Sequence, residues 1–247
     1  MPQPLAPFRD YWRASRAPRY SLLFVLPLFV LYELLAATVG AAHQVRNGAD
    51  AIMRALVDSI AGPWGPLVFG GALIGGSLWL VVRDRRRSAA PLRASVFVGM
   101  LAESTVLASI FGTAVALVTM QLLRPVLAFS AAAQLSSLGW GERLMLSLGA
   151  GLYEELLFRV VLVTFIALFA RRVVGTSPRV ANVIAVVVGA LLFSAAHYVG
   201  AYGDPLQLGS FTFRFVAGLF FSALYVLRGF GITAWTHALY DVFLLVL

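Results

Sequence analysis

Seven apolar runs, each long enough to cross a lipid bilayer, divide this sequence and leave little chain for any other structure. A transmembrane helix needs about 17–25 mostly apolar residues. The runs cover residues 20–42, 66–82, 95–123, 144–170, 180–200, 211–227 and 231–247. Only 12% of the residues are charged, against about 25% in an average soluble domain. We therefore predict an all-α, polytopic transmembrane bundle of about seven spans.

The arginines predict how this bundle is oriented. All 19 basic residues are arginines, and most of them precede the first run or follow the second, fourth and sixth runs. Because basic connections stay on the cytoplasmic side, we expect a cytoplasmic N-terminus and an outward-facing C-terminus. The net charge of +8 then reflects topology, and the expected partner of the chain is the bilayer, not nucleic acid.

Composition also narrows the cellular setting. The first run is too long for a removed signal peptide and lacks a small-residue cleavage pattern, so we expect it to stay as an anchor. Basic residues that are all arginine, with many alanines and valines, are typical of high-GC bacteria, which predicts a multi-pass protein of the cell inner membrane. The absence of cysteine excludes disulfides, thiolate nucleophiles and cysteine metal ligands.

Three charged residues lie inside the fourth apolar run. Glu154, Glu155 and Arg159 stand where an ionisable side chain costs several kcal/mol, so they indicate a functional site. Glu155 and Arg159 are four residues apart and share a helix face, whereas Glu154 is rotated by about 100°. We expect Glu155 and Arg159 to form an ion pair and Glu154 to be free for chemistry. The alternative is an ion-pair network that only holds helices together.

Two of the three histidines also fall inside predicted spans. His197 lies four residues after Phe193, and His237 lies four residues before Asp241. Each histidine therefore shares a helix face with a residue that can line a pocket or orient the imidazole ring. A single histidine in a membrane helix often makes only an interhelical hydrogen bond, but two of them beside the charged run favour a common site.

These residues, in this order, resemble the CPBP family of intramembrane proteases, also known as the CAAX protease and bacteriocin-processing family or the Abi family. Its motifs Glu-Glu-x-x-x-Arg, Phe-x-x-x-His and His-x-x-x-Asn/Asp correspond to three groups of residues here. They are Glu154, Glu155 and Arg159, then Phe193 and His197, then His237 and Asp241. The similarity covers about the last 100 residues.

The resemblance implies hydrolysis of a peptide bond within or at the edge of the membrane. Glu154 would activate water, and Phe193 would line the substrate pocket. His197, His237 and Asp241 would either bind a metal, with zinc the first candidate, or hold the water and the oxyanion. The residues do not decide between a metalloprotease and a glutamate-dependent protease, because the His-Glu-x-x-His helix of soluble zinc proteases is absent.

The resemblance also implies a division of the chain. We expect a cytoplasmic segment, N-terminal transmembrane helices and a CPBP-like catalytic core, at residues 1–19, 20–143 and 144–247. Residues 50–60 place apolar side chains on one helix face and Asp50, Arg54 and Asp58 on the other, which predicts a short interfacial helix. Glycines at 70–76 and 149–151 are expected to let helices approach closely.

Substrates of such an enzyme would be membrane proteins or lipid-anchored peptides. Bacteriocin precursors, peptide pheromones and proteins with a C-terminal sorting helix are candidates, and a prenylated CAAX protein is not expected to be the general substrate. Two other classes stay open. A proton-coupled transporter also uses buried Glu, His and Asp side chains, and a non-catalytic immunity or scaffold protein could retain the same bundle.

The run boundaries set one geometric condition on any such site. They place His197 near the outer end of its run and His237 near the inner end of its own, about 15 Å apart in depth at about 1.5 Å per residue. The histidines can meet if the fifth helix continues past Gly200, or if the sixth and seventh runs form a shallow hairpin. We favour the hairpin, because both runs are short.

Overall fold

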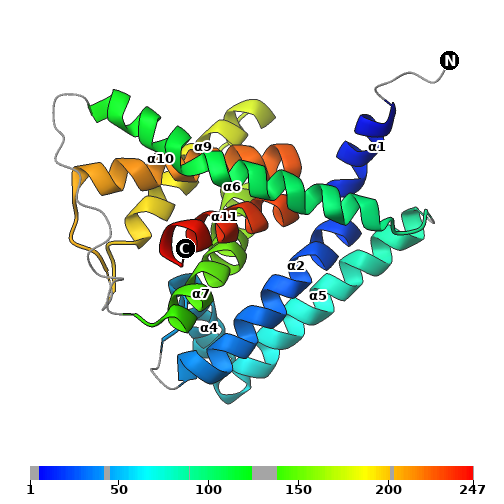
Figure 1. Cartoon of the computed structure of the whole chain (residues 1–247), viewed down its shortest axis with the longest axis horizontal. Coiled ribbons are helices and arrows are strands. Elements are labelled where there is room, and N and C mark those ends of the chain that lie inside the picture. The colour runs from blue at the N-terminus through cyan, green and yellow to red at the C-terminus, as the bar shows by residue number, and fades with distance from the viewer. Residues whose placement is uncertain (1–5, 42–44, 89, 124–137, 201–202, 247) are drawn as a thin grey trace.

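The chain is described by a computed structural model that covers residues 6–41, 45–88, 90–123, 138–200 and 203–246 (Figure 1). All regular secondary structure in these residues is helical, so the predicted all-α fold is confirmed. The helices are α1 (Ala6–Ser15), α2 (Pro18–Leu35), α4 (Gly48–Ala61), α5 (Gly65–Arg87), α6 (Ala94–Leu123), α7 (Trp140–Gly149), α8 (Thr164–Arg172), α9 (Pro178–Ala196), α10 (Leu208–Arg228) and α11 (Phe230–Leu245). Shorter π-helical or 3-10 segments continue α2, α4 and α7.

Among the described residues, five helical stretches are long and apolar enough to cross a membrane. They are Pro18–Gly40, Gly48–Arg87, Ala94–Leu123, Pro178–Ala196 and Leu208–Arg228. The predicted count of seven is therefore not confirmed. Two of the predicted runs are not among these stretches. The run at residues 144–170 carries three charges in its middle. The run at residues 231–247 forms α11, which has only 16 residues, fewer than the roughly 20 of an ordinary span.

The predicted helix at residues 50–60 is present as α4, which Asn47 caps at its N-terminus and Gly62 ends with a φ of 54°. Leu56 and Ile60 are 61% and 83% exposed, so this apolar face points away from the rest of the chain. The expected polar face is partly wrong, because Asp50 is completely buried. It turns inward to accept hydrogen bonds from arginine side chains, which offset the cost of burying its charge.

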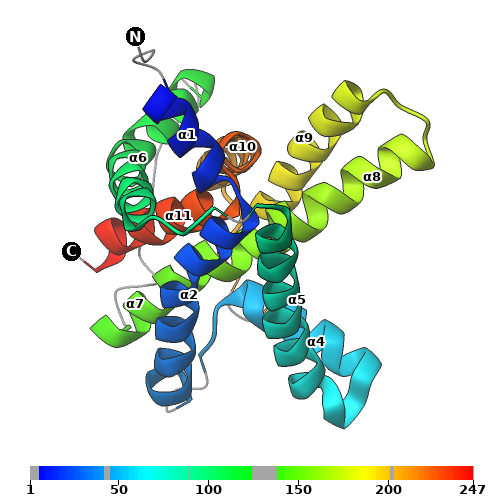
Figure 2. The same cartoon turned by 90° about the vertical axis from the view of Figure 1, so that its right-hand side faces the viewer.

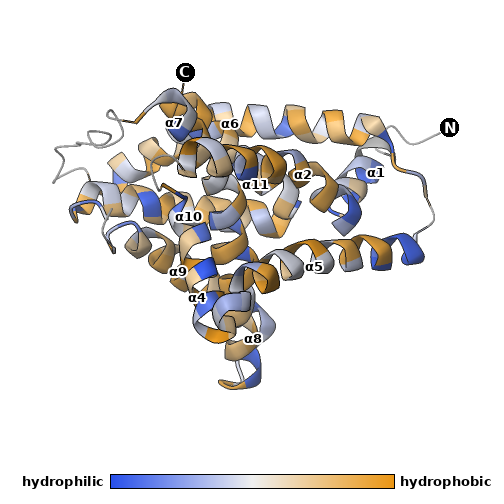
Figure 3. Ribbon diagram, turned by 90° about the horizontal axis from the view of Figure 1, so that it is seen from below, coloured by the Kyte–Doolittle hydropathy of each residue, from blue (hydrophilic) through white to orange (hydrophobic). Residues whose placement is uncertain are grey.

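Helix α11 occupies the middle of the molecule. It packs against α2, α6, α7 and α10, and Figure 2 shows its C-terminal end reaching the edge of the bundle. Helices α2 and α5 run side by side, and α8 and α9 form a second pair that extends away from the rest (Figure 2). Many large apolar side chains of the long helices are exposed, and Figure 3 shows that these helices consist mostly of hydrophobic residues, with a hydrophilic end on α5. Such a surface suits contact with lipid.

The two groups of glycines differ in their surroundings. A Cβ atom at Gly70 or Gly75 would have no other atom within 4 Å, so these positions mark no close helix contact among the described residues. A Cβ atom at Gly151 would collide with the backbone of α11 at Ala234 and would lie 2.6 Å from the Cβ of Ala238. Close helix approach is therefore confirmed at Gly151 and wrong for Gly70 and Gly75.

Candidate active site

The charged residues of the fourth run lie where the helix widens. Between α7 and α8 the chain stays helical through two π-helical segments, Ala150–Glu154 and Leu156–Val163. Wider turns of this kind occur often at functional sites. The missing side chain at Gly151 brings α11 directly against the first of these segments, so residues of α11 lie beside the two glutamates.

Glu155 is the inner of the two glutamates and is fully buried. Its Oε2 lies 3.2 Å from Nε of Arg159, as their spacing predicts. Its Oε1 lies 2.7 Å from Nδ1 of His237. Glu155 therefore joins its own helix to α11, with both partners almost completely buried as well.

The guanidinium of Arg159 has an unusual environment. Its nitrogens make no hydrogen bond to any of the described residues, although the side chain is only 1% exposed. The charge is offset by Glu155 and by two aromatic faces, with ring centroids of Phe193 and Phe221 at 4.3 and 5.4 Å. Cation–π contacts strengthen when both groups are removed from water, so these rings help to hold the buried charge.

Glu154 is the outer glutamate and has a different set of neighbours. Its side chain is 14% exposed, while that of Glu155 is fully buried. Its Oε1 accepts a hydrogen bond of 3.0 Å from Nδ2 of Asn47. Its Oε2 lies 3.9 Å from Nε2 of His197, too far for a direct hydrogen bond. Glu154 thus keeps one oxygen available to a small molecule such as water.

Each of the two histidines is held in place through its own Nδ1 atom. His197 Nδ1 lies 2.8 Å from the backbone carbonyl oxygen of Phe193, and His237 Nδ1 lies 2.7 Å from the Glu155 carboxylate. Since a carbonyl and an ionised carboxylate only accept hydrogen bonds, each Nδ1 is the donor. Both Nε2 atoms are then left to face the other carboxylates, at 3.9 Å from Glu154 and 3.7 Å from Asp241.

The aromatic rings bring the motifs together. The ring of Phe193 lies 5.0 Å from that of His197 and 6.3 Å from that of His237, and Phe221 stacks on His237 at 4.2 Å.

The extension of the fifth helix past Gly200 does not occur, because α9 ends at Ala196. The histidines meet because α11 lies at the centre of the bundle. All seven residues singled out from the sequence therefore gather in one place.

The described residues contain no group of three or more His, Cys, Asp or Glu side chains arranged to hold a metal ion. A histidine that donates its Nδ1 hydrogen to an acceptor and leaves Nε2 open does have the chemistry of a zinc ligand, and His197 and His237 both meet this condition. The predicted zinc site at His197, His237 and Asp241 does not form such a group among the described residues. It stays a prediction, and no catalytic step is assigned to a metal.

Two residues of the cluster were not found from the sequence. Asn47 precedes the glycine that begins α4, and its sequence context indicates a helix cap. Nothing in that context indicates a contact with Glu154, which lies 107 positions further along the chain. Phe221 lies in the apolar helix α10, where nothing in the pattern sets it apart from other phenylalanines. Both contacts depend on how distant helices pack.

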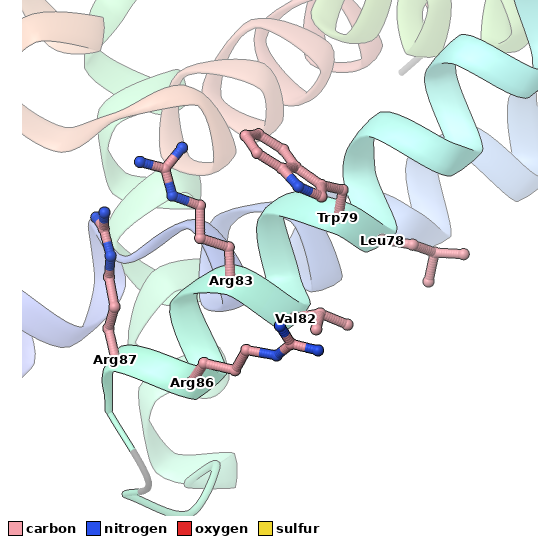
Figure 4. Close-up of a pocket in the computed structure, with 6 residues that line it drawn as sticks. All are labelled: Leu78, Trp79, Val82, Arg83, Arg86 and Arg87. Carbon is pink, nitrogen blue, oxygen red and sulfur yellow. The ribbon is translucent and has the colours of Figure 1, made fainter.

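A surface hollow of about 510 Å³ lies elsewhere, along the end of α5. Its lining consists of Leu78, Trp79, Val82, Arg83, Arg86 and Arg87 (Figure 4). The apolar side chains lie toward the middle of the helix and the arginines toward its end. This gradation is typical of a helix that leaves the bilayer, and none of these residues belongs to the cluster around Glu154.

Comparison with known proteins gives the cluster a context. No curated protein and no solved structure matches the chain. Residues 136–243 match the sequence model of a family described as type II CAAX prenyl endopeptidase Rce1-like. The matched segment contains Glu154, Glu155, Arg159, both histidines of the cluster and Asp241, and it agrees with the resemblance to CPBP intramembrane proteases. Over residues 136–243, the chain is therefore similar to the Rce1-like family of type II CAAX prenyl endopeptidases.

Proposed function

We propose that this protein is an intramembrane endopeptidase in which Glu154 activates water to hydrolyse a peptide bond. One observation carries the proposal. Of the two adjacent glutamates, only Glu154 is partly exposed, and its Oε2 faces His197 without a direct hydrogen bond. A carboxylate with one oxygen fixed and one available, beside a histidine, is suited to act as a general base toward a water molecule.

In this mechanism, Glu154 takes a proton from the water as its oxygen attacks the carbonyl carbon of the scissile bond. The peptide C–N bond breaks in the second step, and the protonated Glu154 returns the proton to the departing amine. Glu155 and Arg159 do not contact the substrate, because they are fully buried. Their role is to fix His237 through the hydrogen bond at Nδ1.

The negative charge that develops on the carbonyl oxygen needs a hydrogen-bond donor. His197 and His237 each supply one when Nε2 carries a proton, and these two nitrogens face Glu154 and Asp241. Phe193 lies beside both histidine rings and would bound the space in which the peptide lies. A zinc ion, if bound at His197, His237 and Asp241, would supply Lewis-acid polarisation of the same oxygen.

The position of the site supports a membrane-associated substrate. It lies among helices whose outward faces are apolar, and the family is named for peptidases that act on prenylated CAAX sequences. We propose a lipid-anchored or transmembrane protein in the cell inner membrane as the substrate class. Bacteriocin precursors, peptide pheromones and sorting-helix proteins belong to this class.

The test replaces Glu154 with glutamine, which keeps the shape and the acceptor for Asn47 but removes the base. The purified variant, in proteoliposomes, is compared with wild type on a panel of membrane-anchored reporter peptides that includes a farnesylated CAAX peptide. We expect cleavage to fall by at least about 100-fold, the lower range of general-base effects. Asp10→Asn, at an exposed carboxylate of α1, is the control and should cleave normally. Equal cleavage by Glu154→Gln and wild type would rule out this mechanism.

A further inference from the structure

Asn47 touches the proposed general base from outside the family-matched segment. Its side chain is 5% exposed, and its Nδ2 donates a hydrogen bond of 3.0 Å to Oε1 of Glu154. Its Oδ1 accepts a hydrogen bond of 2.9 Å from the backbone N–H of Ala49. Because only the amide oxygen can accept from a backbone N–H, the orientation of the amide is fixed, and its NH₂ group must face Glu154.

A second set of hydrogen bonds fixes the backbone of Asn47. Its N–H donates to Oη of Tyr32 at 3.2 Å, and that hydroxyl donates to Asp50 at 2.9 Å. Asp50 is completely buried and accepts from Arg46 at 2.7 Å and from Arg54 at 2.6 Å. A buried carboxylate with two arginine partners is costly to disturb, so the start of α4 is held firmly against α2.

The same network reaches the other side of Glu154 through its neighbour. Tyr153 donates a hydrogen bond of 2.5 Å to Glu33 of α2, and Glu33 also accepts from Arg54 at 2.9 Å. The N-terminal helices therefore bind two consecutive residues, Tyr153 through Glu33 and Glu154 through Asn47. Close approach is possible because position 149 is glycine, where a Cβ atom would lie 2.7 Å from that of Asn47.

We propose that Asn47 is a positioning residue for Glu154, so that the N-terminal helices complete an active site whose other residues lie within 136–243. This inference rests on the proposed function. The amide fixes Oε1, and the remaining oxygen is thereby aimed at the space beside His197. A base held in one orientation avoids the loss of rate that comes from misaligned reacting groups.

Asn47 also caps α4, and this structural role must be separated from the positioning role. Serine is a good N-cap, but its hydroxyl is too short to replace the amide at Glu154. In Asn47→Ser we expect kcat to fall about 10- to 100-fold, the range of a lost hydrogen bond to a charged group, with KM within about twofold of wild type. Ser177 caps α9 in a similar way, through Val180 N–H. Ser177→Ala removes a cap without touching Glu154 and should keep kcat.

A polarity swap tests the contact without any assay of cleavage. Asn47→Asp keeps an acceptor for Ala49 but places a second carboxylate against Glu154, so thermal unfolding should occur several degrees lower than in wild type. In Asn47→Asp/Glu154→Gln the amide and the carboxylate exchange places, and most of that loss should be recovered. A double variant that is no more stable than Asn47→Asp would show that the two side chains do not meet.

The two sets of measurements separate the inference from the function on which it rests. If Glu154→Gln abolishes cleavage while Asn47→Ser keeps the wild-type kcat, the protease stands and the positioning role is overturned. If Glu154→Gln cleaves like wild type, the proposed function fails. The polarity swap then still decides whether Asn47 binds Glu154.

Discussion

Two adjacent glutamates of one helix have different environments. Glu155 is enclosed by Arg159 and His237, whereas Glu154 is bound by Asn47 on one side and open on the other. The difference follows from helix geometry, since consecutive side chains point about 100° apart. As a result, Glu155 supports the structure, whereas Glu154 is free to react.

Removal of the buried arginine tests this division. In Arg159→Leu, Glu155 stays buried without its cation, and loss of one partner of a buried ion pair costs about 3–5 kcal/mol. We expect both the free energy of unfolding and the cleavage rate to fall sharply. Thermal unfolding in detergent measures the first effect, with Glu154→Gln as the matched control that loses cleavage but stays within about 1 kcal/mol of wild type. An Arg159→Leu protein as stable as wild type would contradict the role of this pair.

The two open Nε2 atoms lead to a prediction about metal. If His197 and His237 are zinc ligands, purified protein should contain about one equivalent of metal, and His197→Ala/His237→Ala should contain none. Elemental analysis of both proteins makes the comparison. A metal-free wild-type protein that still cleaves a reporter peptide would mean that Glu154 activates water without zinc.

Local spacing was enough to predict some of these residues and not others. The Glu155–Arg159 pair depends on a separation of four positions along one helix, which the sequence contains. The contact between Asn47 and Glu154 depends on how two helices pack whose residues are 107 positions apart, and no local pattern encodes it. Phe221 was missed for the same reason, because its importance comes only from the ring of His237 that it meets.

At the scale of whole elements, the approach of α11 to the widened helix positions the histidine. Gly151→Ala would force apart two backbones that are in contact, and overpacking of this kind typically costs about 1–3 kcal/mol. We expect lower stability and weaker cleavage, since His237 moves away from Glu155. Thermal unfolding and reporter cleavage measure the two effects.

Gly75→Ala is the control for this prediction. Its Cβ atom would meet no other atom within 4 Å, and alanine favours a helix over glycine by up to about 1 kcal/mol. Stability should therefore stay unchanged or rise slightly. If both alanine variants behaved alike, the close approach at Gly151 would not be what positions α11.

The elements themselves were predicted well, but their lengths and burial were not. Hydrophobic runs locate nearly every long helix, because a membrane helix must be apolar along its length. The same runs do not establish the number of spans, since they do not distinguish a helix that faces lipid from α11, which packs against several other helices. For α4, the pattern predicts the helix but not that Asp50 turns inward, which depends on arginines and a tyrosine near it in space.

For the molecule as a whole, the arginines at the end of α5 predict its orientation (Figure 4). We expect this end, and the N-terminus with it, to face the cytoplasm. The chain contains no cysteine, so a single introduced thiol can report its side of the membrane. In intact cells, a membrane-impermeant reagent should label Ser59→Cys, beyond the other end of α5, and should not label Ala90→Cys until the cells are opened. The reverse pattern would mean the opposite orientation.

The hydrogen bond between Asn47 and Glu154 also has a consequence for how the protein is made. The proposed site draws on residues from position 47 in the N-terminal helices to Asp241 in α11. These side chains can assemble only after residues 47 to 241 have been synthesised and delivered to the membrane. The proposed peptidase would therefore be inert until α11 has been inserted, and neighbouring nascent proteins would not be cleaved by it before then.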